Sequence, residues 1–235
     1  MKLKLNILIF IMGAGLTACS FGKETFVETA YIPIDKTYPN SAKVDSIVTP
    51  YKIQLDAEMN QVITQAEVDF VNNKPWGNLG NLIADIILEK GKTLVADSNV
   101  VCLLNFGGLR APLNKGAITL GDIFKVMPFD NQMVLVKMPA ETMEEIRAYL
   151  KQSGGEPIAG FSIDSLNVFD VYGNPWQAKD FWVITSDYLM NGGDRMYFFQ
   201  KRLETIEPGI LFRDVLIESV QKLTILKDNQ QPRIK

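Results

Sequence analysis

The sequence predicts an α+β (mixed α/β) fold in a single layered domain, with mixed sheets and packed helices. Short apolar, β-branched runs alternate with longer stretches whose apolar residues recur at helical spacing. No internal repeat and no low-complexity linker is found after residue 45. With 47% hydrophobic and 22% charged residues, the 235-residue chain has the composition of a globular protein with a sizeable core.

The first residues are expected to be a targeting segment. Two lysines precede an apolar run from Leu5 to Leu16, and small residues and Cys19 follow. The run is shorter than the about 20 residues that a spanning helix needs, and it resembles a bacterial lipoprotein signal. We therefore expect cleavage after residues 1–18 and a lipid on Cys19, which would anchor an exported protein to the cell envelope, at the outer membrane or the periplasmic face. A plain signal peptide or a short anchor is the alternative.

Elements in the first half are assigned from apolar spacing and capping residues. Residues 47–62 carry apolar side chains about every 3.6 residues, after a possible cap at Asp45–Ser46, and Pro50 falls in the first turn, where proline is tolerated. This stretch should be a helix that follows a tether and extended lead-in, residues 19–45. The other expected elements are strands over 26–32, 63–71 and 100–104, a helix over 79–88 that ends at Gly91, and a helix over 120–126 capped by Thr119 and Asp122.

The second half repeats the alternation of strands and helices. We expect a strand over 133–138, a helix from Pro139 to the glycine pair 154–155, hairpin strands over 161–163, 168–170 and 181–185, and a helix over 208–223. The domain should therefore cover residues 46–226. Residues 227–235 form a polar tail that is expected to fray.

Composition excludes several kinds of chemistry. The chain has no histidine, which removes Ser-His-Asp and Cys-His catalysis and histidine-based zinc sites. Its acidic residues are scattered, so we expect no metal and no cofactor in this chain. The net charge of −3 gives no general attraction to nucleic acid. Cys102 lies in an apolar run and should be a small buried hydrophobic residue rather than a nucleophile.

Candidate site residues gather in three loops that border strands. The first holds Asn105, Gly107, Gly108 and Arg110, the second Phe129, and the third Tyr188, Asn191 and Asp194. Two aromatic faces can stack a base, a carboxylate can accept from sugar hydroxyls, and an arginine can meet phosphate charge. Gly107 and Gly108 can take positive φ, which would allow a sharp turn. The alternative is an ordinary strand-to-loop turn with a solvated arginine and aromatic rings that only pack.

The order of motifs resembles the C-terminal domain of the 5′-nucleotidase / UDP-sugar hydrolase family. The motifs are Leu-Gly-Asn-Leu-Ile-Ala-Asp at 79–85, Asn-x-Gly-Gly-Leu-Arg at 105–110, Met-Pro-Phe-x-Asn at 127–131 and Asn-Gly-Gly-Asp at 191–194. The resemblance covers about residues 47–223. It implies a substrate pocket, whereas the metals and the catalytic His-Asp pair belong to a separate metallophosphatase domain that this chain lacks.

The resemblance also implies roles for single residues. Phe129 and Tyr188 correspond to two rings that sandwich the base, and Asp194 to the ribose contact. Asn105 and Arg110 correspond to contacts on the phosphate side, and Asn191 to a residue that shapes the backbone or meets the base edge.

Several positions depart from the family pattern. Lys74 stands near the place of an upstream arginine, Asp130 follows the Pro-Phe pair where glycine is typical, and Tyr188 replaces a commoner phenylalanine. Arg195-Met196 replaces a usual glycine-aromatic pair.

Three functional hypotheses follow. The leading one is the substrate domain of a 5′-nucleotidase-type hydrolase in nucleotide catabolism, which binds a nucleotide or nucleoside and acts with a separate metallophosphatase chain that holds the divalent metals. The second is an exported binding lipoprotein without catalysis. The third is a structural surface lipoprotein.

Overall fold

The structure is a computed structural model that describes residues 31, 40–177 and 179–235. The expected signal peptide, the lipidation site Cys19 and nearly all of the strand expected over 26–32 lie outside the described residues. Residues Ile47–Lys235 form one compact unit. Among the described residues, no helix is both long enough and apolar enough to cross a membrane.

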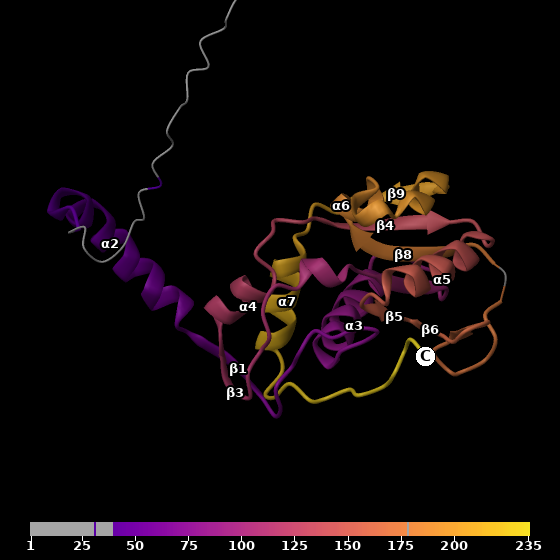
Figure 1. The fold of residues 1–235 in the computed structure, drawn as a ribbon, viewed down its shortest axis with the longest axis horizontal. Coiled ribbons are helices and arrows are strands. Elements are labelled where there is room, and N and C mark those ends of the chain that lie inside the picture. Colours follow the sequence, from indigo (N-terminus) through magenta and orange to yellow (C-terminus); the bar gives the residue numbers. More distant parts are fainter. Residues whose placement is uncertain (1–30, 32–39, 178) are drawn as a thin grey trace, which may run out of the picture. The chain divides into compact units, whose positions relative to one another are not determined.

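Secondary structure follows the predicted alternation (Figure 1). The elements are α2 (Ala42–Met59), β1 (Val62–Ala66), α3 (Asn78–Lys92), β2 (Val100–Leu103), η1 (Phe106–Gly108), β3 (Gly116–Thr119), α4 (Leu120–Val126), β4 (Met133–Met138), α5 (Thr142–Ser153), β5 (Ile158–Ala159), β6 (Phe161–Ile163), β7 (Val168–Asp170), β8 (Phe181–Ser186), α6 (Asp187–Met190), η2 (Gly193–Arg195), η3 (Tyr197–Lys201), β9 (Glu204–Ile206) and α7 (Phe212–Gln221). The mixed α/β fold class is confirmed. The short strands β3, β5 and β9 were not predicted.

Helix α2 differs from the expectation in two respects. It begins at Ala42, so Pro50 lies inside the helix instead of in its first turn. Ser46 does not cap it, because its hydroxyl donates to the carbonyl of Lys43 at 2.9 Å. None of the α2 side chains is buried, including the apolar positions Ile47 and Tyr51. The apolar spacing therefore located this helix but did not predict its environment.

A five-stranded mixed sheet forms the centre of the unit, in the order β5-β2-β8-β4-β9. Strands β2 and β8 are parallel, and the other neighbouring pairs are antiparallel. Strands β4 and β8 lie side by side over their whole length, from Met133 opposite Ser186 to Met138 opposite Phe181 (Figure 1). A parallel pair requires a long crossover, and residues 104–180, with α4, α5 and the β6–β7 hairpin, lie between β2 and β8.

Both faces of this sheet are buried. Alternate residues of one strand enter different cores. Cys102 belongs to a first core that includes residues of α3 and α7, and Leu103 belongs to a second core that includes residues of α5 and η3. Strands covered on both faces are apolar almost throughout, and all six residues of β8 are buried. Cys102 is fully buried and free, as predicted, and burial raises the pKa of its thiol far above the usual value.

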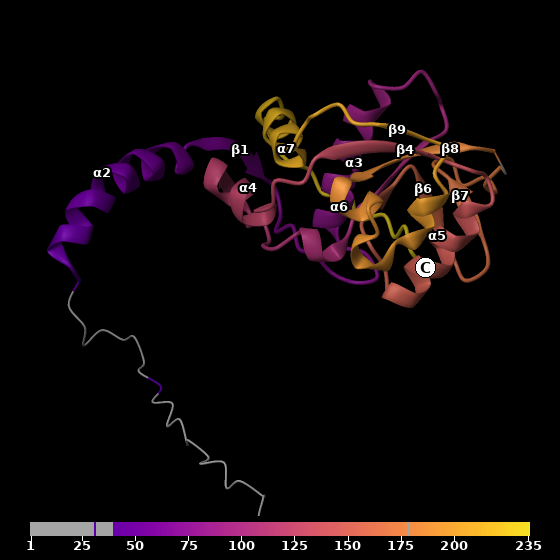
Figure 2. The ribbon, with the colours of Figure 1, turned by 90° about the horizontal axis from the view of Figure 1, so that it is seen from above.

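Helices α4 and α7 and the β1–β3 ribbon lie together (Figure 2) and contribute buried residues to the core that contains Cys102. Helix α4 begins at the predicted place because Thr119 and Asp122 form a capping box, in which each side chain accepts from the other residue's backbone N–H. Helix α5 begins at Thr142, three residues after Pro139, and ends at Gly154 in the left-handed conformation.

The C-terminal tail is docked rather than frayed. The buried Asn81 amide donates to the carbonyls of Asn229 and Gln231, at 3.1 and 3.0 Å. The Arg233 guanidinium contacts both carboxylate oxygens of Asp85, at 2.8 and 2.7 Å. The polar residues of the tail bind polar side chains of α3. Composition alone cannot distinguish such a docked polar segment from a solvated one.

Candidate functional site

Three loops meet at one edge of the central sheet. Because β2 and β8 are parallel, the loops that follow them, from Asn105 and from Asp187, start at the same edge. Strand β4 runs antiparallel to β8 and pairs Met133 with Ser186, so the loop that enters β4 reaches that edge as well. The topology therefore brings together loops that lie far apart in the sequence.

These loops enclose a cavity of about 340 Å³. Its lining consists of Asn105, Gly107, Gly108, Arg110, Phe129, Asn131, Tyr188 and Asp194. Every predicted site residue except Asn191 is among them. The volume falls in the range of pockets that hold small ligands.

Asn131 and Asn191 differ from the predicted list. Asn131 lines the cavity but was not among the predicted residues, although it ends the Met-Pro-Phe-x-Asn motif. Asn191 follows α6, and its amide donates to the carbonyl of Asp187 at 2.9 Å. In the structure Asn191 thus shapes the backbone of the third loop.

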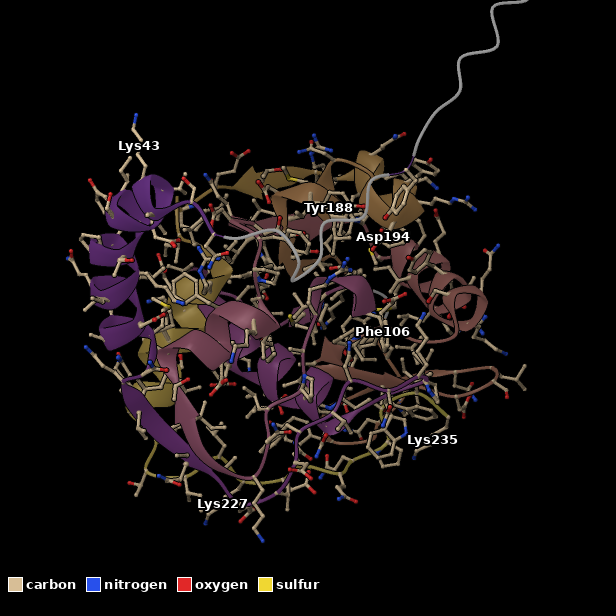
Figure 3. The ribbon with its side chains drawn as sticks, turned by 60° about the vertical axis from the view of Figure 1, so that its left-hand side comes forward. Lys43, Phe106, Tyr188, Asp194, Lys227 and Lys235 are labelled. Atoms are coloured by element: carbon tan, nitrogen blue, oxygen red, sulfur yellow. The ribbon has the colours of Figure 1, made fainter. Side chains whose placement is uncertain are left out.

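The Asp194 carboxylate is the centre of a hydrogen-bond network across the cavity. Its Oδ1 accepts from the Tyr188 hydroxyl at 2.9 Å, and its Oδ2 accepts from the Asn105 amide at 2.6 Å. Figure 3 shows Tyr188 and Asp194 next to each other at this edge. The bond to Asp194 is the main reason why the pKa of Tyr188 is raised, because it favours the protonated phenol.

The backbone of Asp194 is left-handed, with φ of 50° and ψ of 24°. Arg195 follows with φ of 65°. An L-residue in this region costs roughly 1–2 kcal/mol, although aspartate tolerates it better than most. Such a conformation persists only where surrounding contacts hold it.

Two glycines allow close approach of side chains in the site. A Cβ at Gly193 would lie 2.5 Å from the Tyr188 ring, and a Cβ at Gly108 would lie 2.7 Å from Oδ1 of Asn105. Gly107 and Gly108 form the short helix η1, and neither has positive φ. The conformational freedom that these glycines allow is thus not used at either position, and Gly108 matters instead for the space that it leaves beside Asn105.

Arg110 lies against the ring of Phe129. Its guanidinium carbon is 5.6 Å from the ring centroid, and Nη1 donates to the Gly107 carbonyl at 3.2 Å. Phe129 and Tyr188 are each 47% exposed. The cavity thus presents two rings, one cationic fork and one carboxylate to solvent. This combination can bind a flat, polar ligand.

A family profile described as "5'-nucleotidase, C-terminal domain" matches residues 62–201. The chain belongs to this family. The matched residues include all three loops of the cavity, and so the resemblance inferred from the motifs is confirmed.

Relatives of this 5′-nucleotidase C-terminal domain are longer proteins. The trifunctional nucleotide phosphoesterase protein YfkN of Bacillus subtilis is 26% identical over 89% of this chain and 16% of its own length. The 5′-nucleotidase of Rattus norvegicus is 22% identical over 94% of this chain and 45% of its own length. The chain spans less than half the length of these two relatives.

Solved structures show the same fold. A 5′-nucleotidase precursor from Thermus thermophilus aligns with a TM-score of 0.69 at 23% identity, over 84% of this chain and 43% of that one. The NAD nucleotidase of Haemophilus influenzae aligns with a TM-score of 0.64 at 18% identity, over 83% and 41% of the two chains.

The first loop of this 5′-nucleotidase C-terminal domain is held from behind. The amide of Asn72 donates to the Phe106 carbonyl at 2.9 Å, and the buried carboxylate of Glu156 accepts from the Phe106 N–H at 2.6 Å. Lys74 pairs with Glu156 at 3.6 Å and lies over the Phe106 ring. Lys74 is therefore a support for the loop, and it does not line the cavity.

The second loop is held by the start of α7. The side chain of Arg213, only 10% exposed, pairs with the carboxylate of Asp130 and donates to the carbonyl of Met127 at 3.2 Å. Asp130 does not line the cavity, and its carboxylate forms an ion pair with Arg213. Within the described part of the chain, no group of three or more His, Cys, Asp or Glu residues is placed to hold a metal ion.

Proposed function

We propose that this chain is the nucleotide- or nucleoside-binding domain of a 5′-nucleotidase-type phosphohydrolase that serves nucleotide catabolism. Membership of the family supports the class of ligand. The observation that carries the proposal is the cavity itself, in which two exposed aromatic rings and a carboxylate lie within one space of about 340 Å³.

Each lining residue has a proposed role. Phe129 and Tyr188 stack against the base, a contact that any base can make. Asp194 accepts from the ribose hydroxyls. Arg110 and Asn105 contact the phosphate side, because the guanidinium is a fork of donors suited to phosphate oxygens.

Binding is tested by calorimetry with AMP, adenosine and UDP-glucose. Stacking contributes about 1–3 kcal/mol per base, so Phe129→Ala should weaken binding about tenfold. Tyr172→Ala is the matched control, because Tyr172 is 86% exposed and does not line the cavity. The proposal fails if none of the three ligands binds, or if the two variants have equal effects.

In this proposal, a second chain carries out the hydrolysis. The chain aligns with 45% of the length of the 5′-nucleotidase of Rattus norvegicus, and the present sequence has no histidine for a catalytic dyad. A separate exported metallophosphatase would hold the divalent metals and cleave the ligand that this domain binds. The test is AMP hydrolysis by such a phosphatase, encoded next to this protein, with and without this chain. Equal rates would contradict the split enzyme and favour an exported binding protein without catalysis.

Anchoring through a lipid on Cys19 is part of the same proposal. The order of two lysines, an apolar run and a cysteine supports it. Mass spectrometry of the protein from the membrane fraction should find a lipid on Cys19, and Cys19→Ala should release the protein. An unmodified Cys19, or cleavage at another position, would contradict this part.

A further inference from the structure

Every polar atom of Asp194 has a partner in the chain. Besides the two carboxylate bonds described above, its N–H donates to the Tyr188 hydroxyl at 3.3 Å. Its carbonyl oxygen accepts from the Tyr149 hydroxyl at 3.0 Å. Two tyrosines and one asparagine thus hold the backbone and side chain of one exposed residue.

This residue needs to be held because its loop has an uncommon backbone. Gly192, Asp194 and Arg195 have φ of 92°, 50° and 65°, so three of four consecutive residues are left-handed. None of the described strands pairs with this segment, which consists of the turn η2. The Tyr149 hydroxyl, which holds the backbone of this segment, therefore acts together with the Tyr188 hydroxyl and the Asn105 amide to fix the direction of the Asp194 carboxylate.

Tyr149 comes from outside the three loops of the site. It lies on α5, 45 residues before Asp194, and does not line the cavity. Its ring packs edge-on against Phe198 at 5.6 Å between centroids. Burial, followed by the nearby negative charges of Glu156 and Asp194, raises the pKa of Tyr149 to about 12, so its hydroxyl remains a donor at neutral pH.

The held carboxylate is well suited to a vicinal diol. Each ionised carboxylate oxygen can accept about two hydrogen bonds, and the protein uses one position on each oxygen, from Tyr188 on Oδ1 and from Asn105 on Oδ2. One acceptor position on each oxygen is left, and the two hydroxyls of a diol can each donate to one of them. A sugar that lacks both hydroxyls would gain nothing from this arrangement.

We propose that Tyr149 and the hydroxyl of Tyr188 are positioning groups that hold the Asp194 carboxylate for the 2′,3′-diol of a ribose and so determine the preference for ribonucleosides. This inference rests on the proposed function, because it assigns the sugar specificity of the same cavity. Tyr149 acts only through Asp194.

The test compares ligands that differ only in the diol. Affinities are measured by calorimetry for adenosine and uridine, each against its 2′,3′-dideoxy analogue. The wild-type protein should prefer the ribonucleoside, and Tyr149→Phe should lower that affinity about fivefold while it changes the dideoxy affinity by less than about twofold. Tyr188→Phe keeps the stacking ring and should have the same selective effect. Tyr197→Phe is the control, because Tyr197 is an exposed tyrosine of the same region that does not line the cavity.

Two results would overturn the inference while the proposed function stands. One is equal binding of ribose and dideoxy ligands by the wild-type protein. The other is a loss in Tyr149→Phe that is the same for both ligands, which would indicate a merely structural role. If Tyr149→Phe does not fold, the comparison rests on Tyr188→Phe with the same criteria. If the wild-type protein binds no ligand, the proposed function has failed, and the inference with it.

Discussion

The guanidinium of Arg213 binds the carboxylate of Asp130 and, through the same side chain, the backbone that carries Phe129. Its Nη1 reaches the carbonyl of Phe129 at 3.5 Å in addition to that of Met127. The guanidinium also lies 4.4 Å from the centroid of Phe124. Arg213 therefore connects the first turn of α7 to the loop that forms one wall of the cavity.

Removal of Arg213 should be more costly than removal of its acidic partner. Arg213→Met should destabilise the protein by about 2 kcal/mol, because two carbonyls lose a charged donor. Asp130→Asn should cost less than about 1 kcal/mol, because the Asp130 side chain is 75% exposed and returns to water. Urea denaturation measures the free energy of unfolding of both variants. Equal effects would mean that the ion pair, and not the carbonyl contacts, holds the loop.

Gly193 should tolerate no side chain. Gly193→Ala places a Cβ 2.5 Å from the Tyr188 ring, so the ring or the loop must move, at a cost of about 1–3 kcal/mol. Gly107→Ala is the matched control in the same cavity, because the nearest atom to its Cβ is 3.7 Å away. Thermal unfolding should change for the first variant and remain near wild type for the second. A Gly193→Ala protein with wild-type stability would contradict the observed ring position.

Alkaline pH should weaken the fold through the tyrosines around Asp194. The pKa of Tyr149 is raised from 10 to about 12, and that of Tyr188 is raised as well. Since folding favours the neutral phenols, their contribution is complete below pH 10 and is lost as the pH rises toward 12. Denaturant unfolding from about pH 8 to about pH 12 should show this decline, and Tyr149→Phe should flatten it. An unchanged profile in Tyr149→Phe would exclude Tyr149 as the source.

The C-terminal tail should contribute to stability. Arg233→Ala removes the pairing with Asp85 and the bond from Nη1 to the Ile158 carbonyl at 2.6 Å. We expect a loss of about 2 kcal/mol, below the value for a fully buried pair because the Asp85 side chain is 38% exposed. Lys227→Ala, at an exposed position of the same segment, should have almost no effect. Equal stability of the two variants in urea would contradict the docked position of the tail.

Local pattern was sufficient for most of the elements. Helix α4 and strand β4 begin and end where the sequence predicts, because a capping box and an apolar run between turn residues act over only a few positions. The short strands β5 and β9 escaped prediction because two or three residues carry no periodicity of their own. They are strands only because β2 and β4 offer them backbone partners.

The residues of the candidate site likewise fall into a group that the sequence predicts and a group that it does not. Its lining residues lie in short motifs that the sequence alone reveals. Phe129, Tyr188 and Asp194 are examples. The residues that support them are ordinary in their local context. Tyr149 looks like any apolar position of a helix, and Arg213 looks like a helix-surface cation.

The sequence by itself determined the fold class, the family and the chemical groups available to the cavity, including the lack of histidine. Only the tertiary structure decided which residues hold those groups in place. The contacts concerned join residues 45, 83 and 148 positions apart, for Tyr149 to Asp194, Arg213 to Asp130 and Arg233 to Asp85. Such pairs form because the sheet brings distant loops and the tail together, and no local propensity encodes that meeting.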